Sequence, residues 1–390
     1  MISIAAVGPG SSLLITPQVQ QRAGQVARIL AAEGLAARIS LPAEPCPLSE
    51  MATRALETDG DCMILVSGDA GFFSMAKLLL RQLEGKAETE VLCGISSMQY
   101  FCAKLGRGYE NLPFISLHGR NSSFLGAVSY HPAVFLLTGG ANRAQEICRM
   151  LCDAGLPDLR VFAGENLSAE TERILSGTAQ SLSMESFSDL TVLLIENDRY
   201  QDPHLPPRDT DFIRGEVPMT KEEVRMLSVA RLHPAPDDCV WDVGAGTGSV
   251  SIALARAAHN GTVYAIEREP DALMLIEKNR QKLGAYNVLP VAGEAPDALE
   301  DLPAPDAIFI GGSGGNLGQI IQCAETKNPA VRICITAVTL ETLQEAVSAL
   351  EANGRSSEVI QLQVSRTRKA GRYHMLTAQN PIYMILRGEG

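Results

Sequence analysis

Three glycines at alternating positions form the strongest chemical pattern in the sequence. They lie in Val240-Trp241-Asp242-Val243-Gly244-Ala245-Gly246-Thr247-Gly248-Ser249, between a predicted strand and a predicted helix. Glycines let a ligand approach the backbone closely, and the start of a helix presents free N–H groups. A dinucleotide site would read G-x-G-x-x-G and hold a pyrophosphate. This loop reads G-x-G-x-G, with Asp242 two positions before the first glycine, which favours a cationic ligand without phosphate; a plain strand-turn-helix loop is the alternative. The expected ligand contacts are Gly244, Ala245, Gly246, Thr247 and Gly248.

Acidic residues follow the next two predicted strands. Glu267 ends one of them, about 20 residues after the glycines, where a carboxylate can accept hydrogen bonds from both hydroxyls of a ribose. Glu294 and Ala295 follow the other strand. Ahead of the glycine loop, Thr220 and Glu223 have the spacing of a capping box, in which Thr220 caps a helix and Glu223 reaches back. A ligand role for Thr220 stays open beside this structural one.

Glycine-containing segments that directly follow predicted strands, which we call strand exits, also occur in the first half of the chain. They are Val7-Gly8-Pro9-Gly10, Ser67-Gly68-Asp69-Ala70-Gly71, Cys93-Gly94-Ile95-Ser96-Ser97, Ser116-Leu117-His118-Gly119-Arg120 and Leu136-Leu137-Thr138-Gly139. Each glycine alone suits an ordinary turn, but exits from successive strands together outline a cleft. Asp69, the one carboxylate in the set, either orients a ligand or stabilises its own loop as an Asx turn. The expected ligand contacts are Gly8, Gly10, Gly68, Asp69, Gly71, Ser96, Ser97 and Thr138.

Cations gather near the end of a chain whose net charge is −12, in Arg366-Thr367-Arg368-Lys369-Ala370-Gly371-Arg372-Tyr373-His374. Guanidinium groups match carboxylates in a bidentate way. If 357–365 is the last parallel strand and 380–387 its antiparallel partner, this turn lies at the carboxyl-end edge of the sheet. We therefore expect Arg366, Arg368, Arg372 and His374 to bind an anionic substrate, with Arg120 serving the first half similarly. A solvated hairpin tip is the alternative.

The elements that position these residues are predicted to be α/β in both halves, because short apolar runs alternate with amphipathic helical stretches. In the first half, the expected strands are 2–8, 62–68, 88–94, 131–140, 158–165 and 189–196, and the expected helices lie near 17–33, 72–84, 97–105 and 142–154. In the second half, the expected strands are 238–243, 262–267, 287–292, 306–311, 331–337, 357–365 and 380–387, with helices at 220–231, 248–258, 270–283, 316–326 and 340–353. This second series predicts a doubly wound, Rossmann-like sheet with one antiparallel strand.

Two domains are expected. The 390 residues exceed the roughly 250–300 at which single cores stop growing. A polar, proline-rich stretch at 198–218 would not be tolerated inside a helix or strand and is predicted to be the linker. The expected domains are therefore 1–200 and 208–390.

Composition excludes several classes of function. The net charge of −12 argues against nucleic-acid binding, which needs a basic footprint. No apolar run approaches the roughly 20 residues that span a bilayer, and the amino terminus lacks the basic region of a signal peptide, so we expect a cytoplasmic protein without membrane contact. The nine cysteines show no ligand cluster, and no metal site is expected.

The motifs resemble two methyltransferase families. The D-x-G-x-G-x-G loop is similar to that of class I methyltransferases. The segments Gly215-Glu216-Val217-Pro218-Met219-Thr220-Lys221-Glu222-Glu223-Val224-Arg225, 242–251 and 308–315 resemble the decarboxylating, C15-methylating family of cobalamin (vitamin B12) biosynthesis. The glycine exits of the first half resemble the tetrapyrrole methylase fold, particularly its C5-methylating precorrin branch. There, Ala70 and Cys93 stand where that family usually has proline.

The resemblance implies a bifunctional enzyme that uses S-adenosylmethionine. It implies methylation of C5 by the first domain, and methylation of C15 with decarboxylation of the ring C acetate by the second, on a precorrin-6 type tetrapyrrole. It also implies that Thr220, Gly244 to Gly248, Glu267 and Ala295 contact the methyl donor. The equivalent reactions on a cobalt-containing precursor remain an alternative, as do a nucleic-acid or protein methyltransferase and a dinucleotide oxidoreductase or non-catalytic ligand-binding protein. We also expect a homo-oligomer.

Overall fold

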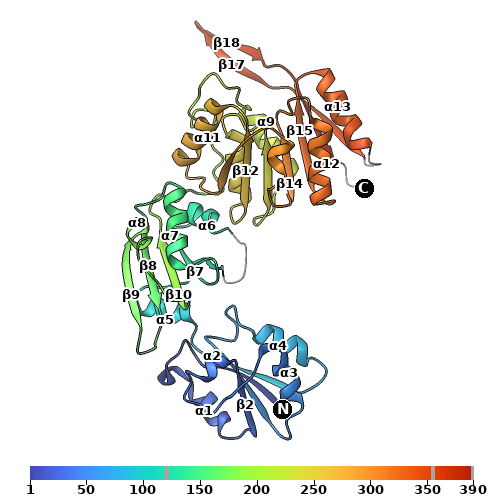
Figure 1. Ribbon diagram of the computed structural model, residues 1–390. Helices are drawn as coiled ribbons and strands as arrows, with labels where there is room; N and C mark the ends of the chain where they lie inside the picture. The colour runs from blue at the N-terminus through green and yellow to red at the C-terminus, as the bar shows by residue number, and fades with distance from the viewer. Residues whose placement is uncertain (118–122, 353–355, 388–390) are drawn as a thin grey trace. The chain divides into compact units, whose positions relative to one another are not determined.

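The computed structural model describes residues 1–117, 123–352 and 356–387. Its contacts divide the chain into two compact units (Figure 1). The first unit comprises Met1–Asn121 and Ala133–Glu196, and the second comprises Ser122–Pro132 and Asn197–Gly390. No helix in the described ranges has the length and apolarity that a membrane crossing needs.

The first unit opens with a parallel five-stranded sheet in the order β3-β2-β4-β1-β5. Buried apolar side chains from β1 and β4 fill both faces, as expected of parallel strands covered by helices. The strands are β1 (Ile2–Ala6), β2 (Arg28–Ala31), β3 (Glu44–Pro45), β4 (Cys62–Val66) and β5 (Thr89–Leu92), and the helices are α1 (Pro17–Ala23), α2 (Glu33–Ala36), α3 (Leu48–Leu56) and α4 (Ala76–Leu83), with a 3-10 turn at Ser12–Leu14.

The single helix expected over 17–33 is wrong. Helix α1 ends at Ala23 with Gly24 as its C-cap, and β2 follows four residues later. Ile29, Leu30 and Ala31 are buried and pair with β4. A short buried apolar run has the same composition in a strand as in a helix, so periodicity alone did not separate the two.

A second, mixed sheet completes the first unit, in the order β6-β7-β10-β8-β9. Only β6 and β7 are parallel, and the other pairs are antiparallel. Strand β9 was not predicted from the sequence, and β6 was indicated only by the strand exit expected at Ser116. The elements are α5 (Ser97–Lys104), β6 (Phe114–Ser116), β7 (Ala133–Leu137), α7 (Ala144–Asp153), β8 (Arg160–Glu165), β9 (Arg173–Thr178), α8 (Ala179–Leu182) and β10 (Thr191–Glu196).

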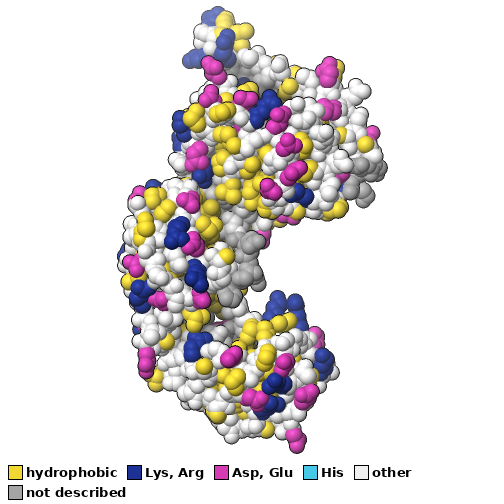
Figure 2. Space-filling model, viewed as in Figure 1, with side chains coloured by type: hydrophobic (Ala, Val, Ile, Leu, Met, Phe, Trp, Pro, Cys, Tyr) yellow, Lys and Arg dark blue, Asp and Glu magenta, His cyan; other side chains and the backbone are white. Residues whose placement is uncertain are grey.

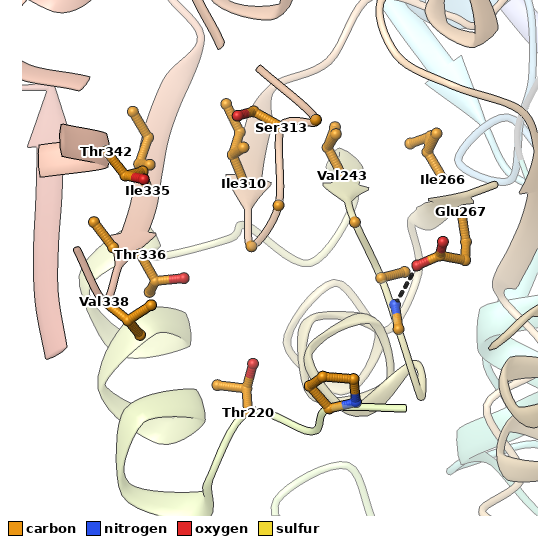
Figure 3. A pocket seen from close by; sticks show the side chains of 18 of the residues that line it. Thr220, Val243, Ile266, Glu267, Ile310, Ser313, Ile335, Thr336, Val338 and Thr342 are labelled. Atoms are coloured by element: carbon orange, nitrogen blue, oxygen red, sulfur yellow. Dashed lines mark hydrogen bonds between the residues drawn. The ribbon is translucent and has the colours of Figure 1, made fainter. Parts of the chain in front are cut away.

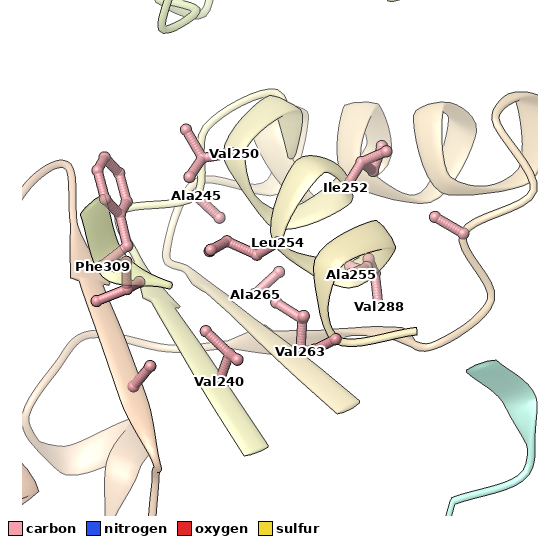
Figure 4. Close-up of a cluster of buried hydrophobic side chains, with 14 of the residues drawn as sticks. Val240, Ala245, Val250, Ile252, Leu254, Ala255, Val263, Ala265, Val288 and Phe309 are labelled. Carbon is pink, nitrogen blue, oxygen red and sulfur yellow. The ribbon is translucent and has the colours of Figure 1, made fainter. Parts of the chain in front are cut away.

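The second unit is a doubly wound seven-stranded sheet in the order β13-β12-β11-β14-β15-β19-β16. Five neighbouring strands are parallel, and β19 lies antiparallel between β15 and β16. Buried clusters fill both faces, and Figure 4 shows the one beneath α10. The strands are β11 (Cys239–Val243), β12 (Thr262–Glu267), β13 (Val288–Ala292), β14 (Ala307–Ile310), β15 (Arg332–Ala337), β16 (Ser357–Leu362) and β19 (Ile382–Arg387), and the helices are α9 (Glu222–Leu232), α10 (Ser249–Ala257), α11 (Pro270–Lys282), α12 (Leu317–Lys327) and α13 (Leu340–Glu351), with a 3-10 turn at Asp297–Leu299.

A two-stranded antiparallel ribbon stands where a simple turn was expected. It is formed by β17 (Ser365–Ala370) and β18 (Tyr373–Ala378), with Gly371 at its tip in the left-handed region. Nearly all its side chains are exposed. Figure 2 shows Lys and Arg side chains over this ribbon, with apolar side chains between them.

Helix α6 (Leu125–Tyr130) belongs to the second unit, although its sequence lies between β6 and β7 of the first. The Ser129 hydroxyl accepts from the Tyr286 N–H at 3.0 Å, and the Tyr130 hydroxyl donates to Asn287 Oδ1 at 3.3 Å. Asn287 Nδ2 in turn reaches the carbonyl oxygens of Ala255 and Ala258. The helix is thus built into a buried hydrogen-bond network of the second unit.

Candidate functional site

A cavity of about 1070 Å³ opens at the carboxyl ends of the parallel strands of the second unit. This is where an open α/β sheet binds its ligand. Figure 3 shows Glu267 on one side of the cavity, Thr336, Val338 and Thr342 on the other, and Thr220 between them. The lining comes from residues 217–221, Val224, 243–246, 266–269, Ala272, 293–295, 310–315, Leu317, 335–338, Thr342, Gln379, Asn380 and Ile382.

The glycine loop is shaped by close backbone approaches. Gly246 has φ +57°, and a Cβ there would lie 3.1 Å from the Pro218 carbonyl oxygen. Gly244 and Ala245 line the cavity beside it. Thr247 and Gly248 do not line it, because Thr247 is buried and Gly248 packs against Ile276 of α11.

Asp242 also lies away from the cavity. It is fully buried at the end of β11 and accepts a hydrogen bond from the Ser251 hydroxyl. Burial raises the pKa of this carboxyl to about 7. Asp242 therefore supports the loop from behind, and the carboxylates on the cavity lining are those of Glu267, Glu269 and Glu294.

Glu267 is held in place by three backbone N–H groups. Its Oε2 accepts from Gly246 at 2.9 Å, and its Oε1 accepts from Arg268 at 2.8 Å and from Glu269 at 3.0 Å. An ionised carboxylate that accepts several backbone hydrogen bonds is held in one orientation, and these bonds stabilise its negative charge. Glu267 can therefore present its remaining acceptor positions to the hydroxyls of a ligand without moving.

The predicted pair after β13 is also at the cavity. Glu294 lies at its exposed rim and forms an ion pair with Arg268, at 3.1 Å between Nη1 and Oε1. Ala295 is buried and lines the cavity wall. Ala295 is thus the better placed of the two for packing against a planar ring.

The capping box predicted for Thr220 and Glu223 is wrong. The N-cap of α9 is Lys221, which makes no side-chain capping bond, and Glu223 pairs with Arg366 at 2.6 Å. Buried Arg225 donates to the Thr220 carbonyl at 2.9 Å and fixes the segment. These contacts leave Thr220 and Lys221 on the cavity lining, with the Thr220 hydroxyl pointing into the open space (Figure 3).

Lys221 was missed by sequence reasoning. A cation at a helix N-cap opposes the helix dipole and supplies no acceptor for the free N–H groups, so local stability does not explain it. Within the described residues Lys221 makes no ion pair, and it faces the cavity. The sequence signal that could have revealed Lys221 is a lysine at a helix N-terminus, where a cation destabilises the helix.

One side of the cavity carries no charged side chain among the described lining residues. It is formed by residues 335–338, Thr342, Gln379, Asn380 and Ile382, which we call the neutral wall. Residues 310–315 lie beside charged groups instead, because a Cβ on Gly314 would be 3.0 Å from Glu294 Oε1 and 3.5 Å from Arg268 Nη1. The Thr336 hydroxyl points into the cavity, and no described group of the protein forms a hydrogen bond with it (Figure 3). Hydroxyl and amide groups among apolar side chains thus face the end of the cavity away from Glu267.

The predicted substrate cations lie on the ribbon and do not line this cavity. Arg366 is engaged by Glu223. Arg372 donates to the Tyr373 hydroxyl at 2.7 Å and lies over its ring. Arg368 and His374 are exposed on opposite strands, while Arg120 falls outside the described residues.

In the first unit the predicted glycine exits meet. Gly8 and Gly68 exchange two backbone hydrogen bonds, at 3.0 and 2.8 Å. A Cβ on Gly94 would lie 2.6 Å from the Gly68 carbonyl oxygen, so only glycine allows this approach. Asp69 accepts from the N–H of Gly71 at 2.8 Å and from that of Gly94 at 3.1 Å. Its carboxylate therefore forms the Asx turn and also joins two exits.

Other predicted residues of the first unit have structural contacts of their own. The Thr138 hydroxyl is buried and donates to the Thr191 carbonyl at 2.7 Å. Ser96 forms a capping box with Gln99, and Ser97 begins α5. Gly10 precedes Ser11, whose N–H donates to the Ser168 hydroxyl.

A cluster of phenylalanines beside these exits was missed by sequence reasoning. The rings of Phe72, Phe73 and Phe114 meet edge to face at 5.1 to 5.9 Å, and Phe73 and Phe114 are exposed. Phe73 has φ +48°, which is unusual for a bulky residue. Exposed aromatic rings held in this way can pack against a flat ligand.

Comparison with known proteins covers both units. Residues 1–183 match the family model described as tetrapyrrole (corrin/porphyrin) methylases, and residues 211–387 match that of the precorrin methyltransferase domain. A Sinorhizobium protein named precorrin-6Y C(5,15)-methyltransferase [decarboxylating] is 30% identical over 316 residues, which cover 79% of this chain and 75% of that protein. The chain belongs to the precorrin-6Y C(5,15)-methyltransferase (decarboxylating) family.

Shorter relatives match about half of the chain. The Salmonella typhimurium protein named cobalt-precorrin-6B C(15)-methyltransferase (decarboxylating) is 40% identical over 181 residues, covering 46% of this chain and 93% of that protein. A solved structure of a precorrin-6Y C5,15-methyltransferase from Geobacter metallireducens is 39% identical, covers 48% of this chain and 97% of that one, and has a TM-score of 0.45.

Membership of the precorrin-6Y C(5,15)-methyltransferase family confirms the predicted fold class. The first unit has the tetrapyrrole methylase fold, and the second is a class I methyltransferase sheet. The readings as a nucleic-acid methyltransferase or a dinucleotide oxidoreductase are set aside.

Proposed function

We propose that this chain is a bifunctional, S-adenosylmethionine-dependent enzyme of cobalamin biosynthesis, acting in the cytoplasm. It methylates C5 and C15 of a precorrin-6 type tetrapyrrole and removes the ring C acetate carboxyl as carbon dioxide. The observation that carries the proposal is kinship across both units with a decarboxylating C(5,15)-methyltransferase. All nine cysteines are free thiols, which agrees with a reducing compartment.

In the second unit, the donor would lie between the glycine loop and Glu267. The carboxylate of Glu267 accepts the ribose hydroxyls, and Ala295 packs against the adenine. The N–H groups of the loop and the hydroxyl of Thr220 remain for the amino-acid end of the donor. Gly244, Ala245 and Gly246 contact the donor directly, whereas Thr247 and Gly248 shape the loop.

In the first unit, the donor would lie at the converging glycine exits. Gly8, Gly10, Gly68, Gly71 and the Ser96–Ser97 segment supply backbone groups, and Asp69 keeps two exits together. The phenylalanine cluster would pack against the tetrapyrrole ring. We assign C5 methylation to this unit and C15 methylation with decarboxylation to the second.

Methyl transfer is an in-line displacement in which the sulfur–methyl bond breaks as a carbon–carbon bond forms. The sulfonium charge is neutralised, so the protein mainly aligns the reactants and excludes water. No catalytic triad is needed.

Cations can bind the carboxylates that the substrate retains, and Lys221 is placed to supply one from the cavity lining. Arg368, Arg372 and His374 of the ribbon would bind carboxylates farther from the reacting carbon. The ribbon also exposes Tyr373, Met375 and Leu376, at 61%, 55% and 74%. A lone two-stranded ribbon is marginally stable, so we propose that homo-oligomer formation covers part of it.

The test is turnover of a defined substrate by the purified chain. We expect two methyl groups added and one carbon dioxide lost from the metal-free precursor, as read by mass spectrometry. Faster turnover of the cobalt-containing precursor would favour the alternative substrate. Absence of methyl transfer to either would refute the proposal.

A further inference from the structure

The neutral wall suits the decarboxylation step. This inference rests on the proposed function. Every charged side chain of the described cavity lining belongs to Lys221, Arg268 or the carboxylates 267, 269 and 294. The neutral wall, formed by residues 335–338, Thr342, Gln379, Asn380 and Ile382, contributes only apolar groups, hydroxyls, amides and backbone. We propose that the acetate carboxylate to be lost as carbon dioxide is held against this neutral wall, at Thr336 and Val338.

The reaction explains why a wall without cations is suitable. The bond between the acetate CH2 and its carboxylate carbon breaks, and the bonding electron pair passes into the conjugated ring. Carbon dioxide leaves, and a proton taken up from solvent converts the side chain to a methyl group. Negative charge therefore moves away from the carboxylate as the bond breaks.

A cation beside that carboxylate would oppose the step. It would stabilise the reactant, where the charge is localised, more than the transition state, where the charge has spread into the ring. The attraction is also stronger in a cavity than in water because the dielectric constant is lower. A neutral donor such as the Thr336 hydroxyl also orients the carboxylate, but it stabilises the reactant much less than a cation would.

Lys221 and the neutral wall would then sort the carboxylates of one substrate. Lys221 attracts a carboxylate that is retained, since a salt bridge there does not oppose any bond breaking. The residues of the neutral wall themselves offer no cation to the acetate that reaches Thr336. This arrangement gives a physical reason why one carboxylate among many is lost.

The experiment compares two substitutions of similar length and different charge at the wall. Thr336→Lys introduces a cation, and Thr336→Met introduces the same bulk without charge. Val338→Lys and Val338→Met repeat the comparison at a side chain that is 71% exposed, where substitution does not disturb the core. Carbon dioxide release and C15 methylation are measured separately with the metal-free precursor, and donor binding is measured by titration with S-adenosylhomocysteine.

We expect Thr336→Lys to release carbon dioxide about tenfold more slowly than Thr336→Met. The difference between Val338→Lys and Val338→Met should be in the same direction but smaller, because solvent screens a charge at this exposed position. Donor affinity should be the same in all four. Equal rates for the lysine and methionine variants, whether fast or slow, would overturn the inference while leaving the proposed function intact. A wild-type chain that releases no carbon dioxide would overturn the proposed function, and this inference with it.

Discussion

The backbone N–H of Gly246 donates a hydrogen bond of 2.9 Å to Oε2 of Glu267. This bond joins the glycine loop to the end of the neighbouring strand β12, across the floor of the cavity. Because Glu267 also accepts from the N–H groups of Arg268 and Glu269, its position is set before any ligand binds.

Glu267→Ala should weaken donor binding by the second unit by about 2 to 4 kcal/mol. The substitution removes the acceptor for the ribose and leaves the Gly246 N–H without its carboxylate partner. Titration with S-adenosylhomocysteine measures the loss. Glu358→Ala, which breaks only an exposed ion pair with Arg231, is the matched control and should bind normally.

Two substitutions should remove the two donor sites one at a time. Gly246→Val places a branched side chain at φ +57° next to Pro218, and Gly94→Val forces a side chain against the Gly68 carbonyl. Wild type should bind about two donors per chain, and each variant about one. A wild-type stoichiometry of one would mean that the second set of motifs is not a working site.

Lys221→Met should raise the KM for the tetrapyrrole by about tenfold, the scale of one lost charge-assisted hydrogen bond. The effect of Arg372→Ala should be smaller, because Arg372 lies over Tyr373 at the ribbon tip and does not line the cavity. Steady-state kinetics at saturating donor test the order. A larger effect of Arg372→Ala would place the substrate on the ribbon instead.

Asp242→Asn should flatten the pH dependence of stability of the second unit. Burial raises the pKa of this carboxyl from 3.8 to about 7 in the folded state, so between these values the folded chain binds more protons than the unfolded one. The contribution of Asp242 is therefore full below pH 3.8 and is lost as the pH rises to about 7. Urea unfolding followed by the fluorescence of Trp241, the single tryptophan, should show the wild type losing stability over that window and the variant losing less.

Asn287→Ala should destabilise the second unit by about 2 kcal/mol or more, because buried carbonyl groups lose their donor. Tyr130→Phe removes only the single 3.3 Å contact to Asn287 and should cost about 1 kcal/mol or less. The same Trp241 fluorescence measures both. Equal losses for the two variants would show that α6, and not the asparagine network, dominates the effect.

The sequence predicted those parts of the site whose residues all lie within one short segment of the chain. The glycine loop, Glu267 and the strands β11 to β15 each depend on neighbours in sequence, and their expected and observed bounds agree closely. Asp69 forms the Asx turn that was one of its two expected roles, whereas its bond from Gly94 came only with the structure. Ligand contacts of Asp69 and Ser96 stay predictions.

The remaining features depend on partners far along the chain. Glu223 satisfies the spacing of a capping box with Thr220, yet its partner is Arg366, 143 positions away. The ribbon was not predicted because nearly all its side chains are exposed, so no alternation of buried and exposed residues marks its strands. Helix α6 joins the second unit through Tyr286 and Asn287, which no local pattern indicates.

The place of α6 in the chain has a consequence for synthesis. Tyr130 and its partner Asn287 are separated by 157 positions. At about 5 to 20 residues per second, α6 leaves the ribosome roughly 8 to 30 s before the strand that buries it. During that interval the nascent first unit completes its own sheets while it carries an apolar helix whose binding surface does not yet exist.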